Sequence, residues 1–269
     1  MEPQFYKGNR DAFMEKLEPG SLALFFSGNP VRKTADEDYG YFANRNFVYL
    51  TGMEQKDTIL MLEKDASGYR ETLFILPPNA FEERWTGTRM KPEEIEAVSM
   101  ISSFAYRDTF EEELKKVLTS GRIQKVYLDI DRMDGQVVVS GADSMEAFLK
   151  QEYPSMPIEN SLPIMKMLRL IKKPCEIRAM EKAQEVTKAG ILAMMTHSRP
   201  GMYEYQYKAE YDYALAQHGV LEAGFPSIIS AGKNNFCIHY YGYRGQAMDG
   251  DIVLNDVGVR WDNELTDVS

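Results

Sequence analysis

Cysteine and histidine are both scarce in this 269-residue chain, which has two cysteines and three histidines. Two cysteines cannot form the disulfide framework of a small secreted protein. Cys175 falls at an expected helix start and Cys237 in an expected strand, so we expect both thiols to be reduced and packed. His197 and His218 fall at expected helix ends, where a capping or solvated role is the ordinary one. Only His239 lies among residues that suggest a site.

The chain also lacks a basic excess, a targeting segment and long apolar runs. Its 41 acidic residues outnumber 31 basic ones, for a net charge of −10. No face dense in Lys and Arg is therefore expected to neutralise phosphates, which argues against nucleic-acid binding. The first residues show no charged-then-apolar signal region, and no apolar run reaches membrane length. We expect a cytoplasmic protein that binds neither nucleic acid nor membranes.

What is present is enough apolar sequence, 44% of the residues, to build the cores of two domains. The first half alternates short strands with amphipathic helices. Strands are predicted at 21–26, 58–62, 71–76 and 125–130, and helices at 111–118 and 144–149. This pattern predicts a mixed α/β domain.

A proline-rich segment, residues 153–163, follows and favours an extended connector, because prolines interrupt regular helices. It suggests a first domain at 1–160 and a second at 161–269. In the second, the periodicity predicts a helix from Pro174 to the Pro200-Gly201 stop and another from about 203 to 218. Strands come after them, so the overall fold class expected is α/β (α+β).

Two aspartates frame the last stretch of sequence. Residues 251–261 are β-branched enough for a strand, Asp262-Asn263 suits a tight turn, and 264–268 begins another strand. If Trp261 and Glu264 close a two-residue hairpin, Asp256 lies opposite Ser269 and Asp267 lies opposite Gly258. Both carboxylates then share one face, with Cα atoms roughly 7–8 Å apart. Such a pair could hold two hard divalent ions about 3.5–4 Å apart, with Gly258 leaving room for them. The plainer alternative is one aspartate at a strand end and one on a solvated face.

Several motifs in order make the chain resemble the aminopeptidase P and prolidase branch of the pita-bread metallopeptidases. The family carries a Gly-Asn loop, a His-Tyr pair, a strand with Leu-x-Asp-x-Gly and a second aspartate. His239, Asp256, Gly258 and Asp267 occupy these positions, with steps of 17 residues from His239 to Asp256 and 11 more to Asp267. Further matches are Arg169-Leu-Ile-Lys-Lys-Pro-Cys-Glu176-Ile177, Arg199-Pro-Gly-Met-Tyr-Glu204, Asn44-Arg-Asn-Phe47 and Trp85-Thr-Gly-Thr-Arg89.

The resemblance implies a mixed α/β N-terminal domain followed by the first half of a pita-bread fold, in which helices cover a curved antiparallel sheet. It also implies an Xaa-Pro aminopeptidase that releases the N-terminal residue before proline, with two divalent ions, expected to be manganese. Asp256 and Asp267 would be metal ligands, His239 a catalytic and substrate-binding residue, and Phe225 part of the substrate pocket.

The family's metal centre also needs a histidine and two glutamates that come later in its sequence and are not matched here. We therefore expect weak or absent metal binding and no activity for this chain by itself. Two alternatives stay open. One is an Xaa-Pro dipeptidase, or prolidase, and the other is a non-catalytic pita-bread module that binds a partner.

In the N-terminal part the family usually shows Asn-Ser-Asp-Phe where this chain has Asn46 in place of the aspartate. A carboxylate role therefore does not transfer to Asn46. Because the family's N-terminal domain takes part in oligomerisation, Trp85 and Arg89 could be intersubunit contacts in a homo-oligomer. They could equally be a core tryptophan with a surface arginine.

Overall fold

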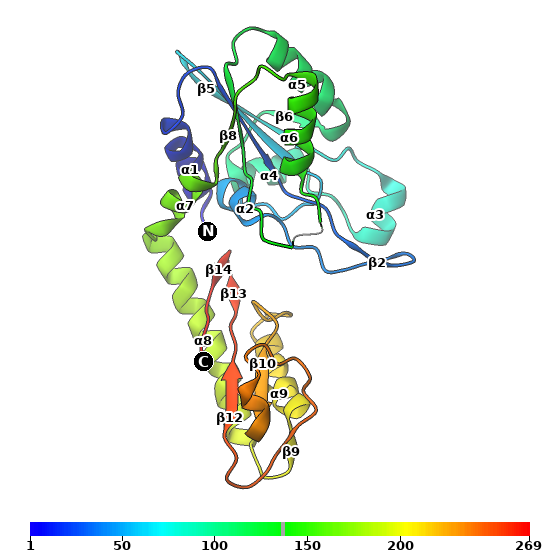
Figure 1. Ribbon diagram of the computed structural model, residues 1–269, viewed down its shortest axis with the longest axis vertical. Coiled ribbons are helices and arrows are strands. Elements are labelled where there is room, and N and C mark those ends of the chain that lie inside the picture. The colour runs from blue at the N-terminus through cyan, green and yellow to red at the C-terminus, as the bar shows by residue number, and fades with distance from the viewer. Residues whose placement is uncertain (136–137) are drawn as a thin grey trace. The chain divides into compact units, whose positions relative to one another are not determined.

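The computed structural model of the protein describes residues 1–135 and 138–269 (Figure 1). Its contacts divide the chain into two compact units, Glu2–Ile171 and Lys172–Ser269. We call them the N-terminal unit and the C-terminal unit. The division falls later than the boundary at 160 expected from the prolines.

A six-stranded mixed sheet forms the centre of the N-terminal unit, in the order β6-β5-β4-β1-β7-β8. Its strands are β1 (Ser21–Phe26), β4 (Ile59–Asp65), β5 (Gly68–Ile75), β6 (Phe104–Tyr106), β7 (Lys125–Leu128) and β8 (Ile158–Asn160). β1 and β5 both run antiparallel to β4. β7 runs parallel to β1, β8 parallel to β7, and β6 parallel to β5. The four strands predicted here are therefore confirmed.

Helices lie against this sheet because successive side chains of a strand point to opposite faces. Leu22 and Leu24 of β1 join a core with Phe110 and Leu114 of helix α5 and Leu149 of α6. Phe25 points the other way and meets the ring of Phe13 on α1 edge-on, with ring centroids 5.1 Å apart. The helices of this unit are α1 (Pro3–Glu15), α2 (Arg45–Thr51), α3 (Ala80–Thr86), α4 (Pro92–Ser99), α5 (Phe110–Thr119), α6 (Gly141–Glu152) and α7 (Leu162–Leu170). A 3-10 turn, η1 (Arg107–Thr109), and a small hairpin of β2 (Arg32–Thr34) and β3 (Glu37–Asp38) complete it.

The proline-rich segment is a strand and a helix of the N-terminal unit rather than a connector. β8 extends the sheet by pairing with β7, and Pro163 stands in the first turn of α7, where a proline costs no hydrogen bond. Tyr49 on α2 donates its hydroxyl to the backbone oxygen of Leu168 at 3.1 Å, which holds α7 in this unit. The boundary between the two units therefore falls after Ile171.

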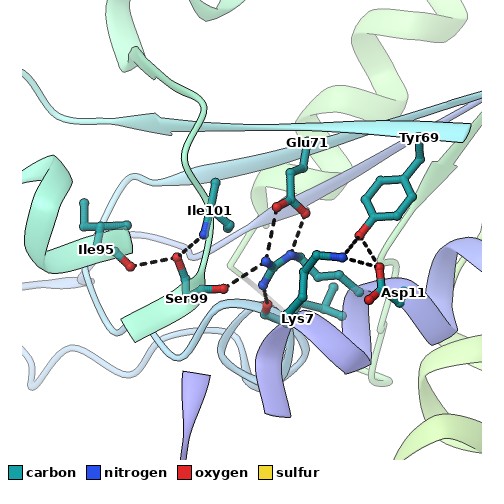
Figure 2. Close-up of polar contacts among 9 residues, drawn as sticks. Lys7, Asp11, Tyr69, Glu71, Ile95, Ser99 and Ile101 are labelled. Carbon is teal, nitrogen blue, oxygen red and sulfur yellow. Dashed lines mark hydrogen bonds and ion pairs between the residues drawn. The ribbon is translucent and has the colours of Figure 1, made fainter. Parts of the chain in front are cut away.

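A buried arginine anchors α1 to the sheet. Arg10 is fully buried and donates to both carboxylate oxygens of Glu71 at 2.7 and 3.2 Å. It also donates to the backbone oxygens of Leu50 at 2.7 Å and Ser99 at 2.8 Å. Figure 2 shows a second polar contact nearby, where the Tyr69 hydroxyl meets Asp11 and Lys7. Burial and the hydrogen bond to Asp11 raise the pKa of Tyr69 to about 12.

Asn46 takes part in a buried polar chain. Its amide donates to Asp129 at 2.9 Å, and its oxygen accepts from Arg169 at 2.8 Å. Burial raises the pKa of Asp129, the charge of Asp131 raises it further, and hydrogen bonds from Asn46 and Asn44 act in the opposite direction. Asp129 thus supplies a carboxylate beside the position where the family usually has one.

Two long helices and short antiparallel strands build the C-terminal unit. α8 (Pro174–His197) and α9 (Glu204–Gln217) agree with the predicted helices, and they share a core through Ala183, Val186 and Tyr211. Gly190 lets the helices approach, since a Cβ there would lie 2.4 Å from the ring of Tyr211. The apolar face of this pair covers Ile229, Val257 and Val259.

The strands of this unit pair two by two. β10 (Ile228–Ala231) runs antiparallel to β12 (Val253–Asp256), β9 (Met202–Tyr203) to β11 (Gln246–Ala247), and β13 (Arg260–Trp261) to β14 (Glu264–Leu265). A 3-10 turn, η2 (Gly232–Phe236), follows β10. The α/β fold class expected from the sequence is confirmed, with helices lying over antiparallel strands in this unit. Within the described residues, no helix combines the length and apolar character that crossing a membrane requires.

Candidate metal site

The hairpin that carries Asp256 and Asp267 has the predicted register. Trp261 pairs with Glu264, and the two backbone bonds between Val257 and Val268 continue the same ladder. Asp262 and Asn263 form the turn with positive φ of 48° and 73°, as a two-residue hairpin requires. Asp256 and Asp267 each stand next to this Val257–Val268 pair, on opposite strands, so their side chains project to the same face.

Gly258 is needed for a different reason from the one expected. A Cβ at this position would lie 1.9 Å from the backbone oxygen of Thr266 and 2.7 Å from the ring of Phe225. The glycine therefore lets the facing strand and an aromatic ring approach, and its expected role in leaving room for ions stays a prediction. Phe225 is half-buried, and its ring lies against Gly258.

Asp256 is held in an unfavourable environment for a lone carboxylate. Burial raises its pKa, and the negative charge of Asp267 raises it further, while Ser269 and His239 act in the opposite direction. Its Oδ1 atom is buried and has no hydrogen-bond partner among the described residues. A buried acceptor without a partner costs free energy unless a ligand satisfies it. This atom and the facing Asp267 fit the donor set that a divalent cation requires.

His239 lies in a turn after η2 and not in a strand. It is exposed, its ring stacks on that of Tyr241 with centroids 6.3 Å apart, and its charge acts on Asp256. The strand expected at Cys237 was wrong, because the Asn234 and Asn235 side chains bond to groups outside this segment. Asn234 donates to Glu204 at 2.8 Å and Asn235 to the Ile252 oxygen at 3.0 Å, which bends the chain. Cys237 is consequently exposed rather than packed, whereas Cys175 lies in the first turn of α8 as expected.

The other two histidines lie at helix ends, as predicted. His197 is the last residue of α8 and its Nδ1 lies 2.7 Å from Glu210. His218 follows α9 as its C-terminal cap. Within the described part of the chain, no group of three or more His, Cys, Asp or Glu side chains is placed to hold a metal ion. The two aspartates by themselves do not make up such a group.

The N-terminal unit contains a cavity. A cavity of about 1060 Å³ opens in the N-terminal unit beside the ends of β1 and β7, lined by Ser27, Asn44, Asp129 and Phe110 among others. Its lining includes neither aspartate of the hairpin. Both aspartates belong to the C-terminal unit.

Glu204 ends the motif Arg199-Pro-Gly-Met-Tyr-Glu204, and the sequence predicts no role for it. The structure buries it completely and surrounds it with donors from the segment that carries His239. The sequence offers no sign of this, because those donors lie 27 to 41 residues away.

Both parts of the chain match known families. Residues 6–127 match the family described as aminopeptidase P, N-terminal domain, and residues 178–269 match metallopeptidase family M24. The sequence is similar to the Xaa-Pro aminopeptidase of Escherichia coli, with 27% identity over 272 residues that cover 99% of this chain and 61% of that protein.

Solved structures agree. One from Bacillus anthracis, assigned to aminopeptidase P, has a TM-score of 0.95 and 31% identity, and the match covers 99% of this chain and 64% of that one. A zinc-substituted Escherichia coli aminopeptidase P in complex with product has a TM-score of 0.88 and 26% identity, with 99% and 61% covered. The chain thus spans about three fifths of these relatives.

The fold and the family match of the C-terminal unit place the chain among the M24 metallopeptidases. The N-terminal unit identifies the family within this class, since it matches the N-terminal domain of aminopeptidase P. The chain belongs to the aminopeptidase P family.

Proposed function

We propose that this protein is an Xaa-Pro aminopeptidase, which releases the N-terminal residue that precedes proline, with Asp256 and Asp267 as metal ligands. One observation carries the proposal. Asp256 keeps a buried carboxylate oxygen without a partner among the described residues while a second carboxylate raises its pKa from the facing strand. A cation between them would relieve both costs.

Each residue then has a defined task. Two divalent ions, which we expect to be manganese, would supply Lewis-acid activation of a water molecule and stabilisation of the oxyanion. Asp256 and Asp267 hold the ions from adjacent strands. His239 faces the substrate, where its imidazole donates a hydrogen bond to the scissile carbonyl. Phe225 forms part of the pocket wall.

Two alternatives are less well supported. Two bacterial relatives similar along nearly the whole chain are described as Xaa-Pro aminopeptidases, which favours this activity over an Xaa-Pro dipeptidase. A non-catalytic binding module has no need for an unpartnered buried carboxylate oxygen facing a second carboxylate. We therefore retain the aminopeptidase.

By itself, this chain should bind metal weakly and show no turnover. Each hard cation takes about six donors, and two aspartates supply only a fraction of them. We also propose that the substrates are peptides with proline in the second position and that the protein forms a homo-oligomer. The cytoplasmic location stays a prediction from the sequence.

Calorimetric titration with Mn²⁺ tests the metal ligands. The unsubstituted chain should take up Mn²⁺ weakly, whereas Asp256→Asn and Asp267→Asn should lose this uptake. Asp249→Asn is the matched control, because Asp249 is an exposed aspartate shortly before the same strand. Equal uptake by all four chains would refute the assignment. Micromolar affinity together with release of a residue from an Xaa-Pro peptide would refute the predicted inactivity.

A further inference from the structure

Glu204, the first residue of α9, is a buried carboxylate that accepts four hydrogen bonds. It is 0% exposed. Oε1 accepts from the Ala231 backbone N–H and from the Asn234 amide, each at 2.8 Å. Oε2 accepts from the Tyr240 hydroxyl at 2.8 Å and from the Gly245 backbone N–H at 2.6 Å. Every lone-pair direction of the carboxylate is therefore in use.

These four donors belong to a single segment, residues 231–245, which we call the His239 loop. Ala231 and Gly245 stand at its two ends, and Asn234 and Tyr240 lie between them. The backbone adds a further bond, from the Glu204 N–H to the Gly245 oxygen at 2.9 Å. One side chain thus ties both ends and the middle of the loop to the start of α9.

The fit around Glu204 is close. A Cβ on Gly245 would lie 2.5 Å from Glu204 Oε1 and 2.4 Å from the Asn234 amide nitrogen. Burial alone would raise the pKa of Glu204, but the hydrogen bonds from Asn234, Tyr240, Gly245 and Ala231 together hold it below its usual range. The carboxylate is therefore ionised at neutral pH, which strengthens all four bonds.

The loop positions the residue that faces the proposed metal site. His239 directly precedes Tyr240, and its ring stacks on Tyr241 on the other side of that anchor. His239 also acts to lower the pKa of Asp256, against the larger effects of burial and Asp267. We propose that Glu204 is a positioning residue, which fixes the His239 loop so that the imidazole is held toward Asp256. The inference rests on the role proposed above for His239.

The chemistry requires a carboxylate and not merely a polar side chain. A glutamine at this position would offer one accepting oxygen and one amide nitrogen that donates. That nitrogen would face two donors from the loop, so at least two of the four bonds would be lost. Glu204→Gln should therefore loosen the loop while leaving the shape of the side chain nearly unchanged.

Amide hydrogen exchange measured by NMR tests, in the absence of metal, whether Glu204 fixes the His239 loop. In Glu204→Gln, the amides of Ala231 and Gly245 should exchange about 10- to 100-fold faster, because opening of the loop becomes easier. Glu210→Gln is the matched control, since Glu210 lies on the same helix and contacts His197 at the surface. Tyr240→Phe removes one anchor only and should accelerate exchange less, which keeps a test available if Glu204→Gln does not fold.

A second measurement follows His239 itself. The chain has three histidines, so His218 serves as an internal reference in every variant and His197 in those that keep Glu210, its partner. Relaxation of the His239 ring should show more motion in Glu204→Gln and in Tyr240→Phe, but not in Glu210→Gln. In the unsubstituted chain, added Mn²⁺ should broaden His239 more than the other two, and Glu204→Gln should reduce this difference.

The outcomes separate the two proposals. Unchanged exchange and unchanged ring relaxation in Glu204→Gln would overturn the positioning role, and so would equal changes in Glu210→Gln. If Mn²⁺ broadens no histidine selectively even in the unsubstituted chain, the proposed metal site fails. In that case the exchange and relaxation measurements still decide whether Glu204 positions the His239 loop.

Discussion

Asp256 illustrates how one residue can be costly for the fold and useful for a ligand. Its pKa is raised by burial and by Asp267, so its ionised form is disfavoured in the folded state. A carboxyl with a raised folded pKa stabilises the protein below its unfolded pKa, and this contribution is lost as pH rises through the folded pKa. At neutral pH the metal-free hairpin therefore carries a repulsive pair.

Asp256→Asn should accordingly raise the thermal midpoint of the metal-free C-terminal unit. We expect a gain of about 0.5 kcal/mol, since solvent screens part of the repulsion, or roughly 2–4 °C for a unit of this size. In excess Mn²⁺ the unsubstituted chain should instead have the higher thermal midpoint, because Mn²⁺ stabilises only the chain that binds it. Fluorescence of Trp261 measures this transition in a chain whose other tryptophan is replaced by Phe. A lower midpoint for Asp256→Asn without metal would contradict the argument.

Glu204 gives the opposite pH dependence. Its folded pKa is lowered, because the four hydrogen bonds of the loop outweigh its burial. The stabilisation is therefore present above the ordinary value of 4.5 and is lost as pH falls through the folded pKa. We expect the protection factors of the Ala231 and Gly245 amides to decrease as the pH is lowered from 4.5 through the folded pKa of Glu204. In Glu204→Gln these protection factors should be low and independent of pH across the same range. If they also decrease at acid pH in this variant, the pH dependence belongs to another group.

At the level of elements, the hairpin from Asp256 to Ser269 depends on one close approach. Gly258→Ala would drive a methyl group into the Thr266 backbone oxygen, and backbone cannot move aside as a flexible side chain can. We expect a loss of about 1–3 kcal/mol in the stability of the C-terminal unit and loss of Mn²⁺ uptake, because the two aspartates lose their register. Urea unfolding and calorimetry measure both. Gly8→Ala, which meets nothing within 4 Å on helix α1, should not destabilise.

Helix α1 depends on a single buried charge. Arg10→Met would leave Glu71 without its partner and two backbone oxygens without a donor. Breaking one side of such a pair costs about 3–5 kcal/mol. Urea unfolding of the N-terminal unit, followed by circular dichroism, should show this loss. Arg70→Met, which removes an arginine half exposed beside Glu63, should change stability by less than about 1 kcal/mol, and equal losses would refute the distinction.

The elements that sequence predicted well are those specified by local chemistry. The Asp262-Asn263 turn and the alternation around it fix the register of the hairpin, and with it the common face of Asp256 and Asp267. The His239 loop was not predictable, because distant Glu204 overrides its β-branched and aromatic residues. The strand β8 was missed for a similar reason, since pairing with β7 outweighs the neighbouring prolines.

At the scale of the whole molecule, motif order identified the family more securely than any single site. The two family matches lie on residues 6–127 and 178–269, in different units. The proposed metal site could be predicted only in part, because the two aspartates lie on one hairpin whereas a complete ligand set would draw on distant parts of a fold. The roles of Trp85 and Arg89 could not be separated from sequence, because exposure is a property of the folded unit.

The structure rejects the alternative of a core tryptophan with a surface arginine. Trp85 is 78% exposed, while the Arg89 side chain is only 14% exposed and binds Glu82 and the Pro77 oxygen. Helix α3 buries none of its described residues, although a seven-residue helix is marginal without packing. Phe81 on the same helix is 72% exposed. A partner surface that covers α3 would supply the missing packing, as the proposed homo-oligomer requires.

Trp85→Ser should therefore weaken self-association by at least about tenfold while leaving the fold intact, because buried tryptophans often dominate interfaces. Sedimentation velocity over a range of concentrations measures the shift toward monomer, and circular dichroism checks the fold. Leu221→Ser is the matched control, since Leu221 is 87% exposed in the C-terminal unit and is not part of α3. If both variants associate like the unsubstituted chain, α3 is not the interface. If both dissociate alike, general surface hydrophobicity and not Trp85 drives association.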